Sequence, residues 1–394
     1  MGQSLSMPID TIVIDRRSCQ HGRFAAAETQ GVRVHHEDAH VTPVTVAVDG
    51  GDGTLLAVFD GHGSDTVSKM AVDVLPKHCR TQFSGGVDWV AAFLKADEQI
   101  RADMPGQDCG GSTAVACLIK ESANGAYDIF VANLGDSRVL LIKQGSDASA
   151  VLATEDHKPD NPEEERRIVD AGGFVERMPL GPARLDGSLA LSRALGDFSY
   201  KADPKREPKD QKCSVVPECY QWSASKGDAV FLACDGIFDV MSNQEVAQFV
   251  LDRMNTEEDV GVIVSGIIAL ALEKGSTDNL SAMVCILGAS TEVEKHQERE
   301  IQHGKFPTVN EIHMLDAYGK FIQKAGFGHH IREGPQGLPN TLASCVVCHR
   351  TFQQMFRCSC DKFEYCSKTC QKIDWKKHRD NCPAKKEYGS PSAV

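Results

Sequence analysis

The order of apolar and amphipathic stretches predicts a layered core of the α/β or α+β class. Seven apolar stretches have the composition of strands, and five longer amphipathic stretches have the pattern of helices. Many strands with a few long helices are typical of sheets covered by helices. The chain has 394 residues, of which 41% are hydrophobic and 25% charged, so we expect a soluble globular protein with two or three domains.

The expected strands are rich in Val, Ile, Leu and Phe, and glycine or aspartate bounds several of them. They are residues 45–48, 55–59, 114–119, 127–133, 139–142, 229–234 and 280–287. The expected helices are residues 64–79, 87–102, 162–171, 243–254 and 259–273. The apolar run 260–272 is shorter than the roughly 18 residues of a membrane span.

Composition divides the chain into five parts. Residues 1–22 are expected to be a tail, 23–290 the main domain, 291–340 a linker, 341–386 a finger and 387–394 a second tail. We expect the first nine residues to have no anchor in a core. One helix is expected in the linker, over 309–325, because Thr308 and Glu311 form a capping box and Gly326 follows the last turn.

Charge is distributed unevenly between the finger and the rest of the chain. Residues 341–394 carry a net charge of +5, whereas the whole chain carries −13, so residues 1–340 carry −18. A strongly acidic main body argues against nucleic acid as its partner.

Two expected strands are each followed directly by the dipeptide Asp-Gly. Asp60 follows one strand and Asp235 follows another, while Asp278 lies just before the strand at 280. If these strands are neighbours, three carboxylates converge on one sheet edge, and such a cluster needs cations because like charges at close range do not all ionise unaided. Oxygen ligands suit Mg²⁺ or Mn²⁺. The alternative is that each Asp-Gly is simply a turn, which we accept for Asp49-Gly50.

Eight motifs in order show that the chain resembles the metal-dependent serine/threonine protein phosphatases of type 2C, the PPM family. They cover about residues 30–288: GVRVHHEDAH (31–40), VFDGHG (58–63), GSTA (111–114), ANLGDSR (132–138), DHKP (156–159), GSLALSRALGD (187–197), CDGIFDV (234–240) and STDN (276–279). The resemblance implies an α+β fold, in which two antiparallel sheets form a β-sandwich flanked by helices.

The resemblance also implies a centre of two Mn²⁺ or Mg²⁺ ions, with a third in some family members. Asp60 is expected to bridge two metals, Asp235 and Asp278 to complete one, and the Gly61 carbonyl to bind the other. Glu37 and Asp38 are expected to act mainly through bound waters. Asp136 and Asp239 match the looser third position.

The implied chemistry is hydrolysis of phosphoserine and phosphothreonine by a water that two cations activate. Arg33 is expected to bind the phosphoryl oxygens with its fork, and His62 to protonate the leaving oxygen. We expect Asp197 and Arg193 to support the fold, and the tandem His35-His36 to be structural or at the surface. The alternative is a catalytically weak or inactive scaffold, although relatives of that kind usually lose metal acids, and all are present here.

The C-terminal segment carries a dense set of soft metal ligands. Seven of the 15 cysteines fall between 345 and 382, together with one suitably spaced histidine. The eight are Cys345, Cys348, Cys358, Cys360, Cys366, Cys370, His378 and Cys382. Eight such ligands make two closed, structural Zn²⁺ sites, and a segment this poor in apolar residues needs the metal to fold.

This order resembles a MYND finger, including Tyr365 before Cys366 and Trp375 before His378. The resemblance implies interleaved pairing, with Cys345, Cys348, Cys366 and Cys370 at one zinc and Cys358, Cys360, His378 and Cys382 at the other. The Cys358-x-Cys360 spacing is one residue shorter than usual, so His349 is an alternative ligand. Such fingers bind partner proteins. The positive charge leaves nucleic acid as a less favoured ligand, because no run of stacking aromatic residues accompanies it.

The first residues, MGQSLS, fit the N-myristoylation pattern with Gly2 as the acceptor. One acyl chain binds membranes only marginally, so we expect reversible membrane association, for which Arg16-Arg17 and Cys19 are weak candidates as a second signal. We therefore expect a cytoplasmic protein with membrane-associated and free forms. The sequence does not exclude the nucleus, where a third reading would make the finger a chromatin adaptor.

Overall fold

The structure is a computed structural model, and it divides the chain into two compact units. It describes residues 4–48, 51–79, 87–104, 110–145, 147–179, 181–256, 259–288, 298–304, 312–333, 339–360, 362–379 and 382. The larger unit comprises residues 16–28 and 36–294, and the smaller comprises 1–15, 29–35 and 295–394. Each unit is built around its own apolar clusters.

The larger unit contains two antiparallel sheets. One has the order β16 (Glu218–Ala224), β10 (Tyr127–Leu134), β9 (Ala114–Glu121), β6 (Gly51–Phe59) and β5 (Ala39–Val48). The other has the order β12 (Leu152–Ala153), β11 (Arg138–Ile142), β17 (Ala229–Ala233), β18 (Leu280–Leu287) and β3 (Gly22–Thr29), followed by β2 (Ile12–Cys19), whose first half belongs to the smaller unit.

Alternation along β6 explains why these sheets form layers. Leu56 and Val58 belong to the cluster between the sheets, with Val230 and Leu232 of β17. The intervening residues of β6 belong to a second cluster, with α1 (Thr66–His78) and α2 (Trp89–Asp103). Because successive side chains of a strand point to opposite faces, one strand serves both clusters.

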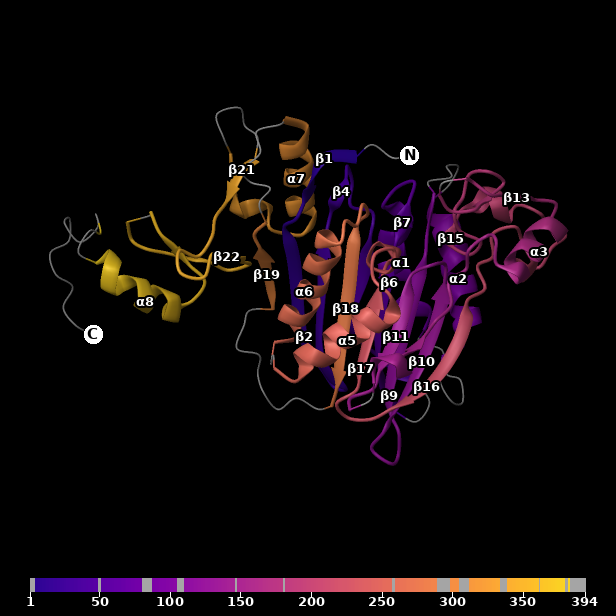
Figure 1. Ribbon diagram of the computed structural model, residues 1–394, viewed down its shortest axis with the longest axis horizontal. Coiled ribbons are helices and arrows are strands. Elements are labelled where there is room, and N and C mark those ends of the chain that lie inside the picture. The colour runs from indigo at the N-terminus through magenta and orange to yellow at the C-terminus, as the bar shows by residue number, and fades with distance from the viewer. Residues whose placement is uncertain are drawn as a thin grey trace. The chain divides into compact units, whose positions relative to one another are not determined.

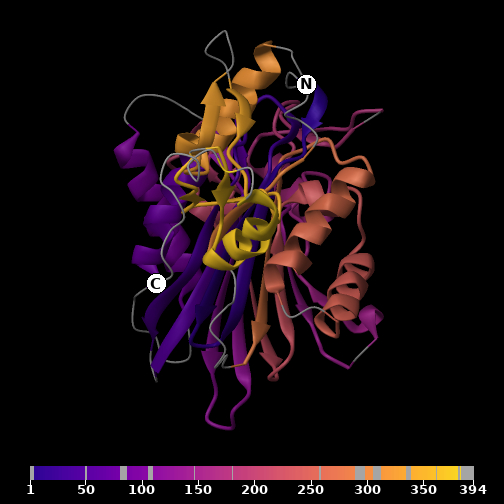
Figure 2. The same cartoon turned by 90° about the vertical axis from the view of Figure 1, so that its left-hand side faces the viewer.

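Helices cover the outer faces of both sheets (Figure 1). α1 and α2 pack on the first sheet, while α4 (Asp235–Phe238), α5 (Asn243–Met254) and α6 (Val260–Glu273) lie over the second. Figure 2 shows these two groups of helices on opposite sides of the strands. The predicted class, a two-sheet antiparallel β-sandwich flanked by helices, is confirmed.

Short elements complete the larger unit. They are β7 (Gly61–His62), β8 (Gly111–Ser112), β15 (Leu195–Gly196), α3 (Pro162–Asp170), β13 (Val175–Glu176), β14 (Arg184–Leu185), and the 3₁₀ turns η1 (Ala148–Ala150), η2 (Phe198–Lys201) and η3 (Pro208–Asp210). β8 pairs with both β7 and β15, and this small sheet carries part of the site described below.

The smaller unit joins both ends of the chain. β1 (Ser4–Ile9) pairs with β4 (Gly31–Arg33), and the first half of β2 pairs with β19 (Arg299–Gln302), which pairs in turn with β22 (Arg350–Phe352). Leu5 and Ile9 are buried in a cluster with α7 (Ile312–Lys324). The expectation that the first nine residues lack a core anchor is therefore wrong for residues 4–9.

The remaining elements of the smaller unit follow α7. They are η5 (Gly328–His330), the hairpin β20 (Ile331–Glu333) with β21 (Pro339–Leu342), the hairpin β23 (Phe356–Arg357) with β24 (Glu364–Tyr365), and α8 (Lys368–His378). The predicted helix at 309–325 is observed over 312–324, whereas its capping box at Thr308 and Glu311, the turn at Asp49-Gly50 and the acceptor Gly2 lie outside the described residues.

Candidate functional site

The ends of β6 and β17 bring the predicted carboxylates into one electrostatic cluster. Asp60 follows β6, and Asp235 follows β17 as the first residue of α4. Burial and repulsion from Asp38, Asp235, Asp278 and Asp136 raise the pKa of Asp60 well above its ordinary value. Burial and repulsion from Asp136, Asp278 and Asp239 do the same for Asp235. Carboxylates from separate segments therefore share one poorly solvated region.

The glycines after Asp60 and Asp235 are required by close backbone contacts. A Cβ on Gly61 would lie 2.4 Å from the carbonyl oxygen of Glu37, and one on Gly236 would lie 2.2 Å from that of Asn279. Both distances are far below van der Waals contact, so larger residues would push the acid-bearing segments apart. The Asp-Gly pairs are therefore part of how the acids are brought together, and the simple-turn alternative does not account for these contacts.

Backbone hydrogen bonds fix the segments that carry the acids. The Glu37 N–H donates to the Asn279 side chain (2.9 Å), and the Ser68 hydroxyl donates to the Glu37 carbonyl (2.5 Å). The Thr113 N–H and the Ser112 hydroxyl both donate to the Asp60 carbonyl, at 2.9 and 3.1 Å. The acids thus stand on a rigid frame, as a preorganised site requires.

Asp38 gives an independent sign that this region suits cations. It is 6% exposed, and neither of its carboxylate oxygens accepts a hydrogen bond of ordinary geometry from the described residues. Burial and repulsion from Asp278 raise the pKa of Asp38, and they outweigh the opposing effects of His36, Ser281 and Cys234. Buried charges in proteins are normally paired or coordinate a metal, so these oxygens and the surrounding acids fit divalent cations.

His62 and Asp197 form a hydrogen-bonded pair beside the carboxylates. The Nε2 atom of His62 lies 2.7 Å from Oδ2 of Asp197, which is buried. Burial disfavours the imidazolium, but the hydrogen bond and charge of Asp197 outweigh this and raise the pKa of His62 above its ordinary value. The protonated form, which can donate a proton, is therefore favoured.

The small β15-β8-β7 sheet makes this pair. Gly111 of β8 is opposite His62 in β7 and opposite Gly196 in β15, which precedes Asp197. A Cβ on Gly111 would lie 2.3 Å from Oδ2 of Asp197, so glycine leaves the space for the carboxylate. Asp197 itself has a left-handed φ of 48°. From the sequence we expect Asp197 to support the fold, and in the structure it also contacts His62.

Arg193 contacts a different group. Its guanidinium donates to the Glu164 carboxylate (2.7 Å), which Arg167 also contacts (2.8 Å). These arginines and the Ser192 hydroxyl offset the effect of burial and lower the pKa of Glu164 to about 2. Arg193 thus anchors α3, in line with a structural role.

Arg33, the predicted phosphate ligand, lies on β4 in the smaller unit. Its carbonyl oxygen accepts a hydrogen bond from the Gln30 side chain (2.9 Å), as does that of Val34. The carboxylates all lie in the larger unit.

Lys158 is a residue of the site that the sequence argument did not single out. Its ammonium forms an ion pair with Oδ2 of Asp136. Lys158 belongs to the DHKP motif of the resemblance. The residues around it do not show that it contacts Asp136, which lies 22 positions earlier in the sequence.

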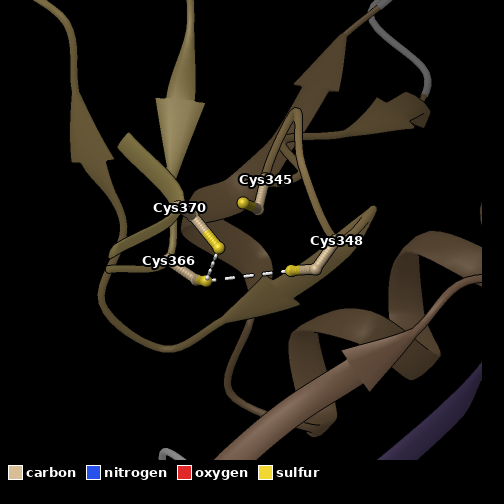
Figure 3. Close-up of side chains that lie close together, drawn as sticks. All are labelled: Cys345, Cys348, Cys366 and Cys370. Atoms are coloured by element: carbon tan, nitrogen blue, oxygen red, sulfur yellow. Dashed lines mark hydrogen bonds between the residues drawn. The ribbon is translucent and has the colours of Figure 1, made fainter. Parts of the chain in front are cut away.

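The finger residues converge as two separate groups of four. Cys345, Cys348, Cys366 and Cys370 form one group (Figure 3), and Cys358, Cys360, His378 and Cys382 form the other. Within each group the candidate ligand atoms lie within 4.8 Å of one another, and His349 is in neither. All 14 described cysteines are free of disulfide bonds.

The distances within these groups match a tetrahedral zinc site. Sγ of Cys366 lies 3.7 Å from that of Cys348 and 3.4 Å from that of Cys370. In the other group, Nε2 of His378 lies 3.4 Å from Sγ of Cys358 and 3.6 Å from Sγ of Cys360. Zn–S bonds of 2.3 Å in a tetrahedron give S···S separations of about 3.8 Å, and S···N separations of about 3.6 Å. Both ligands of the short Cys358-x-Cys360 pair reach His378 in this arrangement.

Buried, mutually repelling carboxylates beside a protonatable histidine fit the site of a metal-dependent hydrolase, and comparison with known proteins gives the family. Residues 22–280 match the protein phosphatase 2C family and residues 345–382 match the MYND finger. The chain belongs to the protein phosphatase 2C family, and it is a metal-dependent protein phosphatase with a C-terminal MYND finger.

Individual relatives agree with this assignment. Protein phosphatase 1B of Rattus norvegicus is 34% identical over 326 residues, which cover 77% of this chain and 78% of that protein. Probable protein phosphatase 1N of Mus musculus is 38% identical over 289 residues, covering 71% and 68%.

Solved structures are similar as well. A phosphatase from Toxoplasma gondii superposes with a TM-score of 0.64 at 26% identity, covering 74% of this chain and 99% of that one. A Caenorhabditis elegans sex determining protein gives 0.56 at 26% identity, covering 68% and 65%.

Proposed function

We propose that this phosphatase hydrolyses phosphoserine and phosphothreonine at a two-cation centre held by Asp60, Asp235 and Asp278. The Gly61 carbonyl, Glu37 and Asp38 complete the centre, and Asp136 and Asp239 serve a third cation. The observation that carries the proposal is a set of buried carboxylates that raise one another's pKa and include Asp38, whose oxygens accept no hydrogen bond of ordinary geometry from the described residues. Mn²⁺ or Mg²⁺ bound there supplies an activated water and neutralises charge on the phosphoryl group.

The chain's own residues then divide the remaining tasks. His62 donates a proton to the leaving serine or threonine oxygen, and the hydrogen bond from its Nε2 to Asp197 keeps it protonated. Arg33 binds phosphoryl oxygens, for which its fork of donors is suited. Rigid support of the Glu37 and Asp60 segments lowers the reorganisation needed during the reaction.

The test of this function is phosphate release from a phosphothreonine peptide. Turnover should require Mn²⁺ or Mg²⁺ and stop when a chelator is in excess. Turnover that survives a strong chelator, after dialysis that removes divalent ions, would contradict the metal centre.

We propose further that the finger holds two structural Zn²⁺ ions and binds a partner protein. Ile373 on α8 is 54% exposed and Trp375 is 37% exposed, and lysines at 368, 372, 376 and 377 stand on the same helix. This combination suits a peptide with apolar and acidic residues. Binding of fluorescent proline-rich and acidic peptides should be lost in Ile373→Ser. It should be kept in Lys320→Ser, which changes an exposed residue on α7. Equal binding by both variants would contradict a binding surface on α8.

We propose that Gly2 is acylated and that the protein is cytoplasmic and associates reversibly with membranes. Among the described residues, none of the helices has the length and apolar character of a membrane span. Intact-mass measurement of protein made with an N-myristoyltransferase should show the added acyl chain in wild type and its loss in Gly2→Ala. An unmodified mass in both would refute acylation.

A further inference from the structure

Lys158 brings a positive charge into the group of acids assigned to the third cation. Its ammonium pairs with Asp136, and it also acts electrostatically on Asp235 and Asp239, opposing the increase in their pKa values. The side chain of Asp136 is 5% exposed and that of Lys158 is 30% exposed. One ammonium therefore neutralises part of the charge of three carboxylates.

The loop that carries Lys158 is held against the turn that carries Asp136. The His157 N–H donates to the Gly135 carbonyl (2.9 Å), and the Ser192 N–H and hydroxyl both donate to the His157 carbonyl (3.2 and 2.9 Å). On the other side, the Asn161 side chain donates to the Asp156 carbonyl (2.7 Å). The backbone on both sides of Lys158 is thus held at the site, while its side chain stays free to rotate, unlike a lysine that meets an acid by chance at the surface.

Arg138, a second cationic residue near these acids, is already paired with Asp156. Arg138 donates to both oxygens of Asp156 (2.6 and 2.9 Å) and to the Asn243 side chain (2.9 Å). Three hydrogen bonds therefore hold its guanidinium on Asp156 and Asn243, and its effect on Asp136 is electrostatic, without a direct ion pair. Among the described residues, Lys158 is the cationic group for which a direct ion pair with Asp136 is recorded.

We infer that Lys158 acts as a built-in cation that competes with the weakest-bound divalent ion for Asp136. An ammonium is a compact point charge with rotatable donors, so it can stand where a metal would and move away when one binds. A divalent ion that binds Asp136 must displace this ion pair, and the affinity at that position is reduced accordingly. Lys158 thus sets how much Mn²⁺ or Mg²⁺ the third position needs, while the two other positions are left to Asp60, Asp235 and Asp278. This inference rests on the proposed metal centre.

The experiment measures Mn²⁺ binding to the full chain without substrate, by calorimetry and by electron paramagnetic resonance of free Mn²⁺. Lys158→Gln removes the charge at similar length, and Lys158→Arg keeps it. Lys212→Gln is the matched control, because Lys212 forms an ion pair with Asp186 at 2.7 Å and its side chain is 31% exposed.

Removing one unit charge next to a carboxylate should tighten the weakest Mn²⁺ step by at least about tenfold. We expect this in Lys158→Gln, with less than about threefold change in Lys158→Arg and Lys212→Gln. An unchanged or weakened step in folded Lys158→Gln would overturn the inference. If wild type binds no Mn²⁺ and shows no chelator-sensitive turnover, it is the proposed function that fails.

A second measurement avoids dependence on the folding of the glutamine variant. Lysines of the wild-type chain are ¹³C-methylated, and the Lys158 resonance is assigned from its loss in Lys158→Arg. During a Mg²⁺ titration this resonance should shift with the weakest binding step, as the ammonium leaves Asp136. A resonance that stays fixed through that step would overturn the inference.

Discussion

The carboxylate cluster and the cysteine groups of the finger both have the chemistry of metal sites, but they differ in how closely their ligand atoms lie. In the finger, the ligand atoms already lie within 4.8 Å of one another, and among the described residues only these two groups of three or more candidate ligands meet that limit. The acids around Asp60 are close enough to raise one another's pKa but are more widely spread. Thiol groups can approach without charge, whereas buried carboxylates repel.

This difference predicts different roles for the metals. A compact tetrahedron of four ligands leaves no open position, so the finger's metals hold structure. A wider set of oxygen ligands leaves room for water and substrate, and the surrounding β-sandwich is built on its own apolar core. The carboxylate centre should therefore lose and regain its cations without unfolding, and the finger should not.

The largest expected effect is that of Asp60→Asn. We expect turnover to fall by about three orders of magnitude or more, because the acid assigned to both cations is lost. In the metal-free protein the same change should raise the melting temperature, since it removes one of several repelling carboxylates. Calorimetry with and without Mn²⁺ measures this. Asp252→Asn, an exposed change on α5, is the control, and a lower melting temperature for metal-free Asp60→Asn would contradict the repulsion.

The next effect concerns proton donation by His62. His62→Gln should slow hydrolysis of a phosphothreonine peptide about 10²- to 10⁴-fold, but slow a nitrophenyl phosphate far less, because that leaving group needs little protonation. Asp197→Asn should show the same substrate dependence to a smaller degree, since it removes the partner that favours the imidazolium. An equal loss on both substrates, measured as kcat for each variant, would refute the acid role and its positioning by Asp197.

The third effect tests the finger half of the comparison. Cys358→Ser should lose one of two zinc ions and unfold the region around α8, because its thiol contacts both His378 and Cys382. Zinc content by elemental analysis and protease sensitivity of residues 345–382 report this. Cys219→Ser, at an exposed cysteine of β16, should change neither. Retention of two zinc ions by Cys358→Ser would refute the ligand assignment.

The smallest effect is a pH dependence at Glu164, a buried acid of α3 that is not among the proposed metal ligands. The folded-state pKa of this residue is lowered to about 2 from 4.5. The resulting stabilisation is therefore complete above about pH 4.5, and is lost as the pH falls toward about 2. This stabilisation amounts to roughly 3 kcal/mol. Urea unfolding of wild type and Glu164→Gln between pH 2.5 and 6 checks this; parallel curves for the two proteins would contradict it.

Much of the larger unit could be predicted from local pattern. The strand at 280–287 and the helix at 243–254 have the predicted bounds, and the strands at 55–59 and 229–234 and the helix at 162–171 are present with bounds that differ by at most four residues. β16 is not among the predicted strands, because it is an edge strand with only one face packed against the core. The alternation of Tyr220 and Trp222 with exposed residues is the sequence pattern that could have predicted it. β1 is not among the predicted strands either, because its burial depends on α7, which lies about 300 residues away in the sequence.

The site shows the same division. Asp60 and Asp235 could be predicted because an acid directly after a buried strand is a local feature. The His62–Asp197 pair and the Lys158–Asp136 pair could not, because each joins segments through the fold: the first through the pairing of β7, β8 and β15, and the second through the attachment of His157 to Gly135. The motifs contain all four of these residues, but the order of the motifs does not show which residues contact one another.

The measurement that tests the central claim most directly is phosphate release from a phosphothreonine peptide across a range of Mn²⁺ concentrations, with wild type and Asp60→Asn side by side. The account predicts turnover in wild type that rises with Mn²⁺, stops with a chelator and returns when Mn²⁺ is restored, and none in the folded variant. Turnover in Asp60→Asn comparable to wild type, or wild-type turnover indifferent to the chelator, would contradict it.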